Sequence, residues 1–272
     1  MQVDTDGYLR FLVERDGEPD LARRTLARRE AFFAALAAEP LRATVPVDRA
    51  AYLRNLNRRR PEDGLDARIL WLLATAHANQ AERFGVGLAE LYGLVTPESD
   101  RVRLHVTLQE MYHTRILGDV LALFDLPMRH RPPGIGTRAM THLMVRTPER
   151  WHLPLVGAAE MVGCVMFETL RDRGLELFAC DTQVAARIRR LFDEILGDEL
   201  GHVGFIASLL GPLGRATMRG LQRMLAVPLA HGVPAMVALL GRRELRRRFR
   251  TDFRPDRLAA TLPGLTYVAA HP

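Results

Sequence analysis

The sequence predicts an all-α protein built on a four-helix bundle, with one long connection inside the bundle and further helices at both ends. Apolar residues recur at helical spacing through nearly the whole chain, and no alternating β-branched run is followed by a hairpin turn. Four long helical segments are joined by a short, a long and a short connection. We expect residues 1–272 to form a single domain, with the bundle at 65–210 and helical extensions at 1–64 and 211–272.

Eight helices are expected, and local signals mark their ends. Pro61 ends the second helix because proline cannot continue a helix, and Pro127 follows the end of the fourth. Thr96, Pro97 and Glu98 supply the cap, the first-turn proline and the first-turn acid that start the fourth helix. The expected ranges are 20–38, 47–60, 65–95, 97–125, 154–179, 181–210, 215–229 and 233–250.

The long connection of the bundle is expected at 127–147, because this segment is rich in Pro, Gly and Arg. Pro154 is expected to start the third bundle helix and Asp181 to cap the fourth. The fourth bundle helix is expected to end before Gly211 and Pro212.

Two short motifs lie deep inside apolar helical segments: Glu110-Met-Tyr-His113 and Glu199-Leu-Gly-His202. Residues three apart on a helix lie on one face, about one turn apart, so a carboxylate and an imidazole can reach the same ion. A third match, Glu149-Arg-Trp-His152, follows a Thr-Pro pair, and we interpret its Glu as a first-turn residue facing the helix dipole.

Two more glutamates, Glu82 and Glu168, complete a layer with Glu110 and Glu199. Each of the four lies about 14–18 residues from one end of its expected helix, or about 20–27 Å along the axis from an end of the bundle. Glu160 lies about 12 Å from the height of Glu168. It shares roughly the same face, so a place in a polar channel stays open for it.

Charge balance favours a site for two metal ions. Four ionised glutamates facing a core would be very costly without cations, and two divalent ions neutralise them. The alternative, solvent-facing Glu and His side chains, conflicts with the apolar neighbours of Glu110 and Glu199. Cys164 and Thr114 lie four residues from Glu168 and Glu110 on the same helix faces, so both could line the pocket. The alternative is that Cys164 is only a buried thiol and that the Thr114 hydroxyl bonds to its own helix.

This constellation resembles the ferritin-like diiron-carboxylate superfamily over about residues 65–210. The resemblance implies a ferritin-like four-helix bundle and an iron-binding site. The Gln109-Glu-Met-Tyr-His113-Thr segment is similar to AurF-type arylamine N-oxygenases, although Ile195 stands where that family has a third His. Uncharacterised ferritin-like bacterial oxidases are similar around Asp198-Glu-Leu-Gly-His202. The iron ligands implied are Glu82, Glu110, His113, Glu168, Glu199 and His202, with Asp198 expected to bond His113 and Gln109 to bond His202.

The function implied is a non-haem diiron oxidase or oxygenase that activates O2 and acts on a small organic substrate with an external electron donor. The cofactor is two Fe ions, or one Mn and one Fe. Two alternatives remain open: an iron-handling, ferroxidase-like protein and a tRNA-modifying diiron hydroxylase. A homodimer is compatible with the sequence.

Composition limits other functions. All 38 basic residues are Arg, so the net charge of +6 reflects an Arg-rich chain, and the absence of Lys excludes Schiff-base chemistry and a phosphate-loop lysine. The Arg242–Arg250 segment is interpreted as a solvated helix face rather than a nucleic-acid or membrane site. No uninterrupted apolar stretch of about 18 residues occurs, and Cys164 and Cys180 have no metal-finger spacing, so a cytoplasmic protein is expected.

Overall fold

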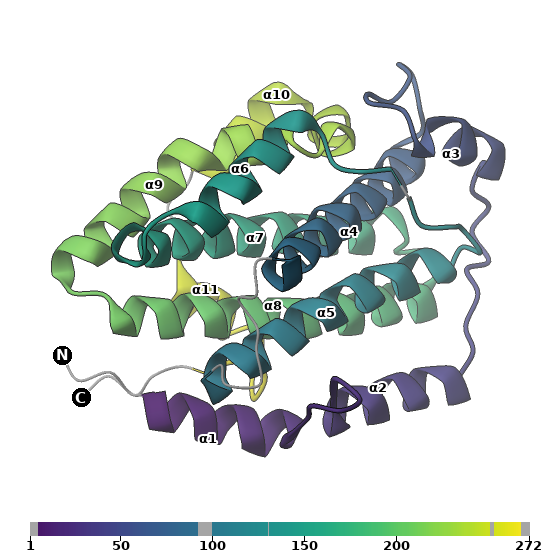
Figure 1. Cartoon of the computed structure of the whole chain (residues 1–272). Helices are drawn as coiled ribbons and strands as arrows, with labels where there is room; N and C mark the ends of the chain where they lie inside the picture. The colour runs from purple at the N-terminus through teal and green to yellow at the C-terminus, as the bar shows by residue number, and fades with distance from the viewer. Residues whose placement is uncertain (1–4, 92–99, 130, 251–252, 268–272) are drawn as a thin grey trace.

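The computed structural model describes residues 5–91, 100–129, 131–250 and 253–267, and these residues are helical almost throughout (Figure 1). The described residues form eleven helices and one very short antiparallel hairpin, so the all-α prediction is confirmed. In chain order the elements are α1 (Thr5–Asp16), β1 (Pro19–Asp20), β2 (Thr25–Leu26), α2 (Ala27–Ala38), α3 (Arg49–Leu56), α4 (Ala67–Leu91), α5 (Arg101–Ala122), α6 (Ile135–Arg146), α7 (Glu149–Leu177), α8 (Thr182–Leu209), α9 (Pro212–His231), α10 (Pro234–Arg250) and α11 (Pro255–Ala259).

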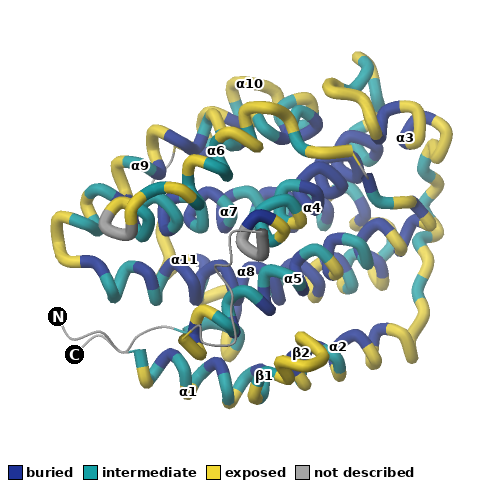
Figure 2. Tube along the Cα trace, in the orientation of Figure 1, coloured by how far each residue is buried: buried dark blue, intermediate teal, exposed yellow. Residues whose placement is uncertain are grey.

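Four long helices, α4, α5, α7 and α8, form the centre of the fold. Helix α4 packs on α5 and α7 packs on α8, while contacts from α5 to α8 and from α4 to α7 close the group. In Figure 1, α1 and α2 lie along one side of these four helices, and α6, α9 and α10 lie along the other. One large apolar cluster, with Trp71 and Phe178 fully buried, extends through the group (Figure 2).

The structure differs from the predicted elements at both ends of the chain. Helix α1 was not predicted, and the predicted helix at 20–38 is a hairpin followed by α2. The predicted tail contains the short helix α11, and Gly241 kinks α10 by adopting a left-handed φ of 73°.

The connection between α5 and α7 is also different, because it contains the helix α6. Helix α7 starts at Glu149 rather than at Pro154, which lies inside it. Its start is set by Pro148, whose carbonyl accepts hydrogen bonds from the backbone N–H groups of Trp151 and His152.

Helix α5 begins at Arg101, where the Asp100 carboxylate accepts from the N–H groups of Val102 and Arg103. The helix start predicted at Thr96, Pro97 and Glu98 lies outside the described residues.

Helix α7 contains a long apolar stretch. Its Trp151–Leu177 portion is long and apolar enough to cross a membrane by length and composition, although 56% of the most apolar window is buried inside the protein. Buried core helices of soluble proteins have the same length and composition, so this property is only weak evidence for a membrane-spanning helix.

Candidate metal centre

The two Glu-x-x-His motifs face each other from α5 and α8. His113 and His202 are buried, and their ring centres lie 6.3 Å apart. The Nδ1 atom of His113 lies 3.5 Å from Glu110 Oε2 and 3.4 Å from Glu199 Oε1, and Nδ1 of His202 lies 3.2 Å from Glu110 Oε1. Each imidazole therefore presents the same ring nitrogen to the carboxylates between the two helices.

Two further glutamates join these motifs, one from α4 and one from α7. Glu82 belongs to a group with Glu110, His113 and Glu199 in which the ligand atoms all lie within 4.8 Å of one another. Glu160 forms a second such group with Glu110 and His202. Glu110 belongs to both groups, so this carboxylate is placed to bridge two ions.

Glu168, the residue predicted from α7, lies outside both groups. Burial raises the pKa of Glu168, and the charged residues that shift this pKa are Asp172, Arg171, Arg257 and Arg248. None of these four residues belongs to either group. The structure therefore does not bring the predicted ligand Glu168 into either group. The prediction measured its height from Pro154, whereas α7 starts at Glu149. Counted from the observed helix starts, Glu160 lies 11 residues along α7 and Glu110 lies 9 residues along α5, whereas Glu168 lies 19 residues along α7.

Four buried atoms of the site have no hydrogen-bond partner in the described ranges: Glu110 Oε1, His113 Nδ1, Glu199 Oε2 and His202 Nδ1. All four belong to the two groups just described. Buried polar atoms are nearly always paired, because an unpaired one costs about 1–3 kcal/mol. An imidazole lone pair facing carboxylate oxygens is repulsive unless a cation or a proton lies between them, so this donor set fits a pair of divalent cations.

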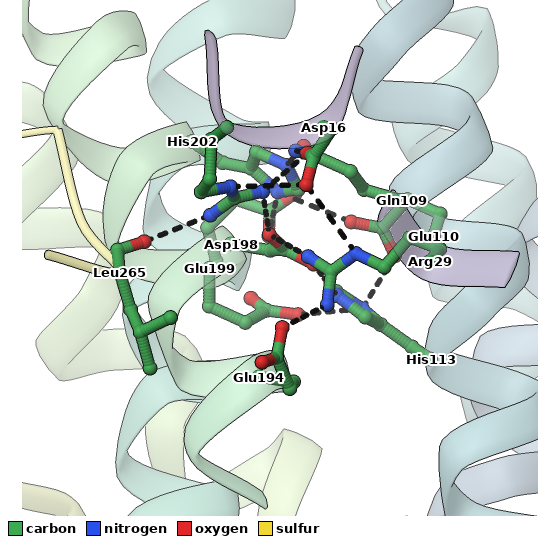
Figure 3. A network of polar contacts seen from close by, with 12 residues as sticks. Asp16, Arg29, Gln109, Glu110, His113, Glu194, Asp198, Glu199, His202 and Leu265 are labelled. Atoms are coloured by element: carbon green, nitrogen blue, oxygen red, sulfur yellow. Dashed lines mark hydrogen bonds and ion pairs between the residues drawn. The ribbon is translucent and has the colours of Figure 1, made fainter. Parts of the chain in front are cut away.

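The other ring nitrogen of each histidine is held by the partner that its sequence position predicted (Figure 3). His113 Nε2 lies 3.1 Å from Asp198 Oδ2, and His202 Nε2 lies 2.9 Å from Gln109 Oε1. The Gln109 amide nitrogen donates to Asp16 at 2.8 Å, so its oxygen must accept from His202. Both imidazoles thus donate from Nε2, which leaves the Nδ1 lone pairs for a metal.

Arginines from the N-terminal helices α1 and α2 hold Asp198 in place. This contribution was not predicted from the sequence. Arg29 on α2 is fully buried and donates to both oxygens of Asp198, at 2.5 and 2.6 Å. Arg15 on α1 also bonds Asp198 and forms an ion pair with Asp16 at 2.6 Å. Glu194 completes the cluster by pairing with Arg29 and, at 2.8 Å, with Arg28.

The arginines fix the charge of Asp198. Burial alone would raise the pKa of this carboxyl, but Arg15 and Arg29 hold that pKa well below its usual range. Asp198 is therefore a stable anion that orients His113 and strengthens it as a donor to a metal.

Burial and mutual charge shift the pKa values of the ligands themselves. Burial opposes a charged imidazole, but Glu110, Asp198 and Glu199 together outweigh it and keep the pKa of His113 well above its ordinary value. Glu110 and Glu160 likewise raise the pKa of His202 to about 9. Burial and neighbouring carboxylates raise the pKa of Glu82 and Glu199 well above the ordinary range. Protons on these groups offset the negative charge of the cluster, and divalent cations would compete with them.

Gly163 on α7 leaves room for the Glu199 carboxylate. A Cβ at this position would lie 2.9 Å from Glu199 Oε2. The neighbouring Cys164 is buried, and Glu199, Glu160 and Glu168 all help to raise the pKa of its thiol, so it lies near the carboxylates. Thr114 instead bonds the Met111 carbonyl at 2.7 Å, which is the purely local role.

One side of the cluster is more open than the other. Glu199 is buried, whereas Glu82, Glu110 and Glu160 are half-buried, with side-chain exposures of 22% for Glu110 and 19% for Glu160. The half-buried carboxylates from α4, α5 and α7 therefore lie on the more exposed side of the cluster. Tyr112 is not part of it, because its hydroxyl donates to Glu30 at 2.7 Å, on the α2 side.

Comparison with protein-family models, with curated proteins and with solved structures finds no match for this chain. The description of the site therefore depends on its geometry alone.

Proposed function

We propose that the chain is an O2-activating diiron oxidase with a ferritin-like bundle, in which two iron ions bind among α4, α5, α7 and α8. The ligands in this proposal are Glu82, Glu110, His113, Glu160, Glu199 and His202.

The observation that carries the proposal is the convergence of buried, unpartnered ligand atoms on one space. Four such atoms come from two helices, and carboxylates from two other helices meet them there. Four carboxylates and two imidazoles neutralise two divalent cations, and this mixed oxygen and nitrogen donor set suits iron. A structural cluster of carboxylates would be expected to pair these atoms with protein donors instead.

Iron bound by these ligands would supply the redox chemistry that O2 reduction requires, with electrons from an external donor. The protein residues have other tasks. Glu110 lies between the two imidazoles and is placed to hold both ions at a fixed separation. Asp198 and Gln109 keep each imidazole in the tautomer that binds metal. Apolar packing around His113, including Phe167 at 6.5 Å between ring centres, limits water on the buried side.

The test is metal analysis of the purified chain followed by O2 consumption. The proposal predicts about two Fe per chain, and rapid O2 uptake by the reduced protein that is lost in Glu110→Ala. An iron-handling protein would instead oxidise many added Fe(II) ions per chain and retain them as ferric iron. Full metal content in Glu110→Ala would contradict the proposed site.

A further inference from the structure

A cavity of about 720 Å³ lies beside α4, outside the candidate metal centre. It is lined by the segment after α3, by α4, by the connection into α6 and the start of α6, and by the end of α9 with the turn into α10. His77, Gln80 and Ala81 line it from α4. Since successive helix residues are rotated by about 100°, these side chains point away from the direction of Glu82.

The charge of this cavity is strongly positive. None of the described residues that line it is acidic, and five are arginines. Five guanidinium groups around one cavity repel one another, and an anion bound between them would remove this repulsion. The five are Arg59, Arg60, Arg129, Arg131 and Arg138.

Arg129 is the most buried of the five arginines, with only 9% of its surface exposed. Among the residues that the structure describes, its Nε has no hydrogen-bond partner, and the Nη2 contact to the Arg58 carbonyl is long, at 3.5 Å. No carboxylate in the described ranges forms an ion pair with it. Burial and the charge of Arg131 lower the pKa of Arg129. A buried cation without a counter-charge is costly, so this guanidinium lacks the partner that its burial requires.

His77, which lines the cavity from α4, also lacks hydrogen-bond partners among the described residues. It is 4% exposed, and neither of its ring nitrogens has a hydrogen-bond partner within the described part of the chain. Burial and the nearby Arg129 lower the pKa of His77 to about 3, so the imidazole is neutral at physiological pH. A neutral imidazole can donate one N–H to an anionic oxygen without adding to the positive charge.

The rest of the lining limits the ligand. Ile135, Met140 and Leu229 provide an apolar surface, while the described lining contains no Phe, Tyr or Trp on which a base or aromatic ring could stack. The volume is much larger than an inorganic ion needs. We propose that the cavity binds an aliphatic organic anion with two or more negative charges, its phosphate or carboxylate oxygens held by Arg129, Arg131 and His77. This inference does not depend on the proposed metal chemistry.

Thermal unfolding of the full chain tests the proposal, with pyrophosphate and tricarballylate as probes and NaCl at equal ionic strength as the reference. A saturable rise in Tm of about 5 °C or more is expected with one probe at a hundred times its Kd. Stabilisation by pyrophosphate identifies a phosphate ligand, and stabilisation by tricarballylate a carboxylate ligand. No rise above the NaCl reference with either probe would overturn the proposal.

Variants show whether the effect comes from this cavity. Arg129→Met removes an unpaired buried charge, so it should raise the Tm without probe and abolish the shift caused by the probe. Arg54→Gln, an exposed arginine on α3 outside the cavity, should keep the full shift. A lower starting Tm in Arg129→Met together with an intact shift would show that Arg129 is only structural.

A second variant covers the case in which Arg129→Met does not fold. Arg59 is exposed and lines the cavity, so Arg59→Gln should leave the starting Tm unchanged and weaken probe binding at least about threefold. Equal probe affinities in Arg59→Gln and Arg54→Gln would contradict the proposal.

Discussion

Glu160 and Glu168 lie two turns apart on α7, and only Glu160 has a carboxylate beside His202, with Oε2 3.8 Å from Nδ1. Glu160→Gln keeps the size of the side chain and removes its charge. Glu168→Gln makes the same change about 12 Å along the helix axis and serves as the matched control. We expect the first change to weaken metal binding and the second to leave it unchanged.

The expected size of the effect follows from the charge that is removed. A carboxylate about 4 Å from a cation contributes about 4 kcal/mol at an effective dielectric constant near 20, which corresponds to about a thousandfold in affinity. The Glu160 side chain is 19% exposed, and solvent reduces this figure. Glu160→Gln should therefore weaken binding of the metal ion held by Glu110, Glu160 and His202 by a factor on the order of 10²–10³.

Competition with a chromophoric chelator for Co(II), at fixed pH and salt, measures both metal affinities. Circular dichroism confirms that each variant is folded. The reasoning is refuted if Glu168→Gln loses affinity while Glu160→Gln binds two metal ions as tightly as the unmodified protein.

Three other predictions follow from the contacts around the two sites. Gln109→Leu removes the acceptor of His202 Nε2, so metal affinity should fall about 10- to 100-fold; an unchanged affinity in chelator competition would contradict the positioning role. Gly163→Ala should displace Glu199 and lower metal content, whereas Gly220→Ala, at an open helix position, should raise stability by about 0.5–1 kcal/mol; normal metal content in Gly163→Ala, measured by atomic absorption, would count against the packing argument. His77 has a pKa below that of the unfolded chain, so protons bind preferentially to the unfolded state and stability falls as pH drops below about 6.5. Between pH 6.5 and 5 this loss is about 2 kcal/mol, and urea denaturation of His77→Asn should show a smaller pH dependence.

The parts of the site that could be predicted depend on local helix geometry. A Glu and a His three positions apart must share a helix face, so the pairs Glu110/His113 and Glu199/His202 follow from spacing alone. Asp198 and Gln109 each directly precede the Glu of a pair, and the structure places both against the opposite imidazole as expected.

Glu160 could not be selected with certainty because its assignment depends on where α7 begins. Pro154 resembles a helix start, yet a proline near the beginning of a 29-residue helix removes one hydrogen bond without ending it. The sequence does contain the correct signal, since Pro148 and Glu149 have the pattern of a first turn. Counted from Glu149, Glu160 lies 11 residues and Glu168 lies 19 residues along the helix, on either side of the 14–18 residues of the expected layer, so the start of α7 alone does not select between them.

The contributions of α1 and of the basic cavity could not be predicted, because they depend on contacts between distant segments. In a chain this rich in arginine, Arg15, Arg29 and Arg129 have no local feature that distinguishes them from exposed arginines. Their burial results from how α1, α2 and the connection before α6 pack on the bundle.

Anomalous diffraction at the iron edge from crystals of the iron-loaded protein tests the central claim most directly. The account predicts two iron peaks per chain, about 3.5–4 Å apart, with Glu110 between them, Glu160 near one peak and Glu82 near the other. A single peak, peaks at Glu168, or no iron among these six ligands would contradict it.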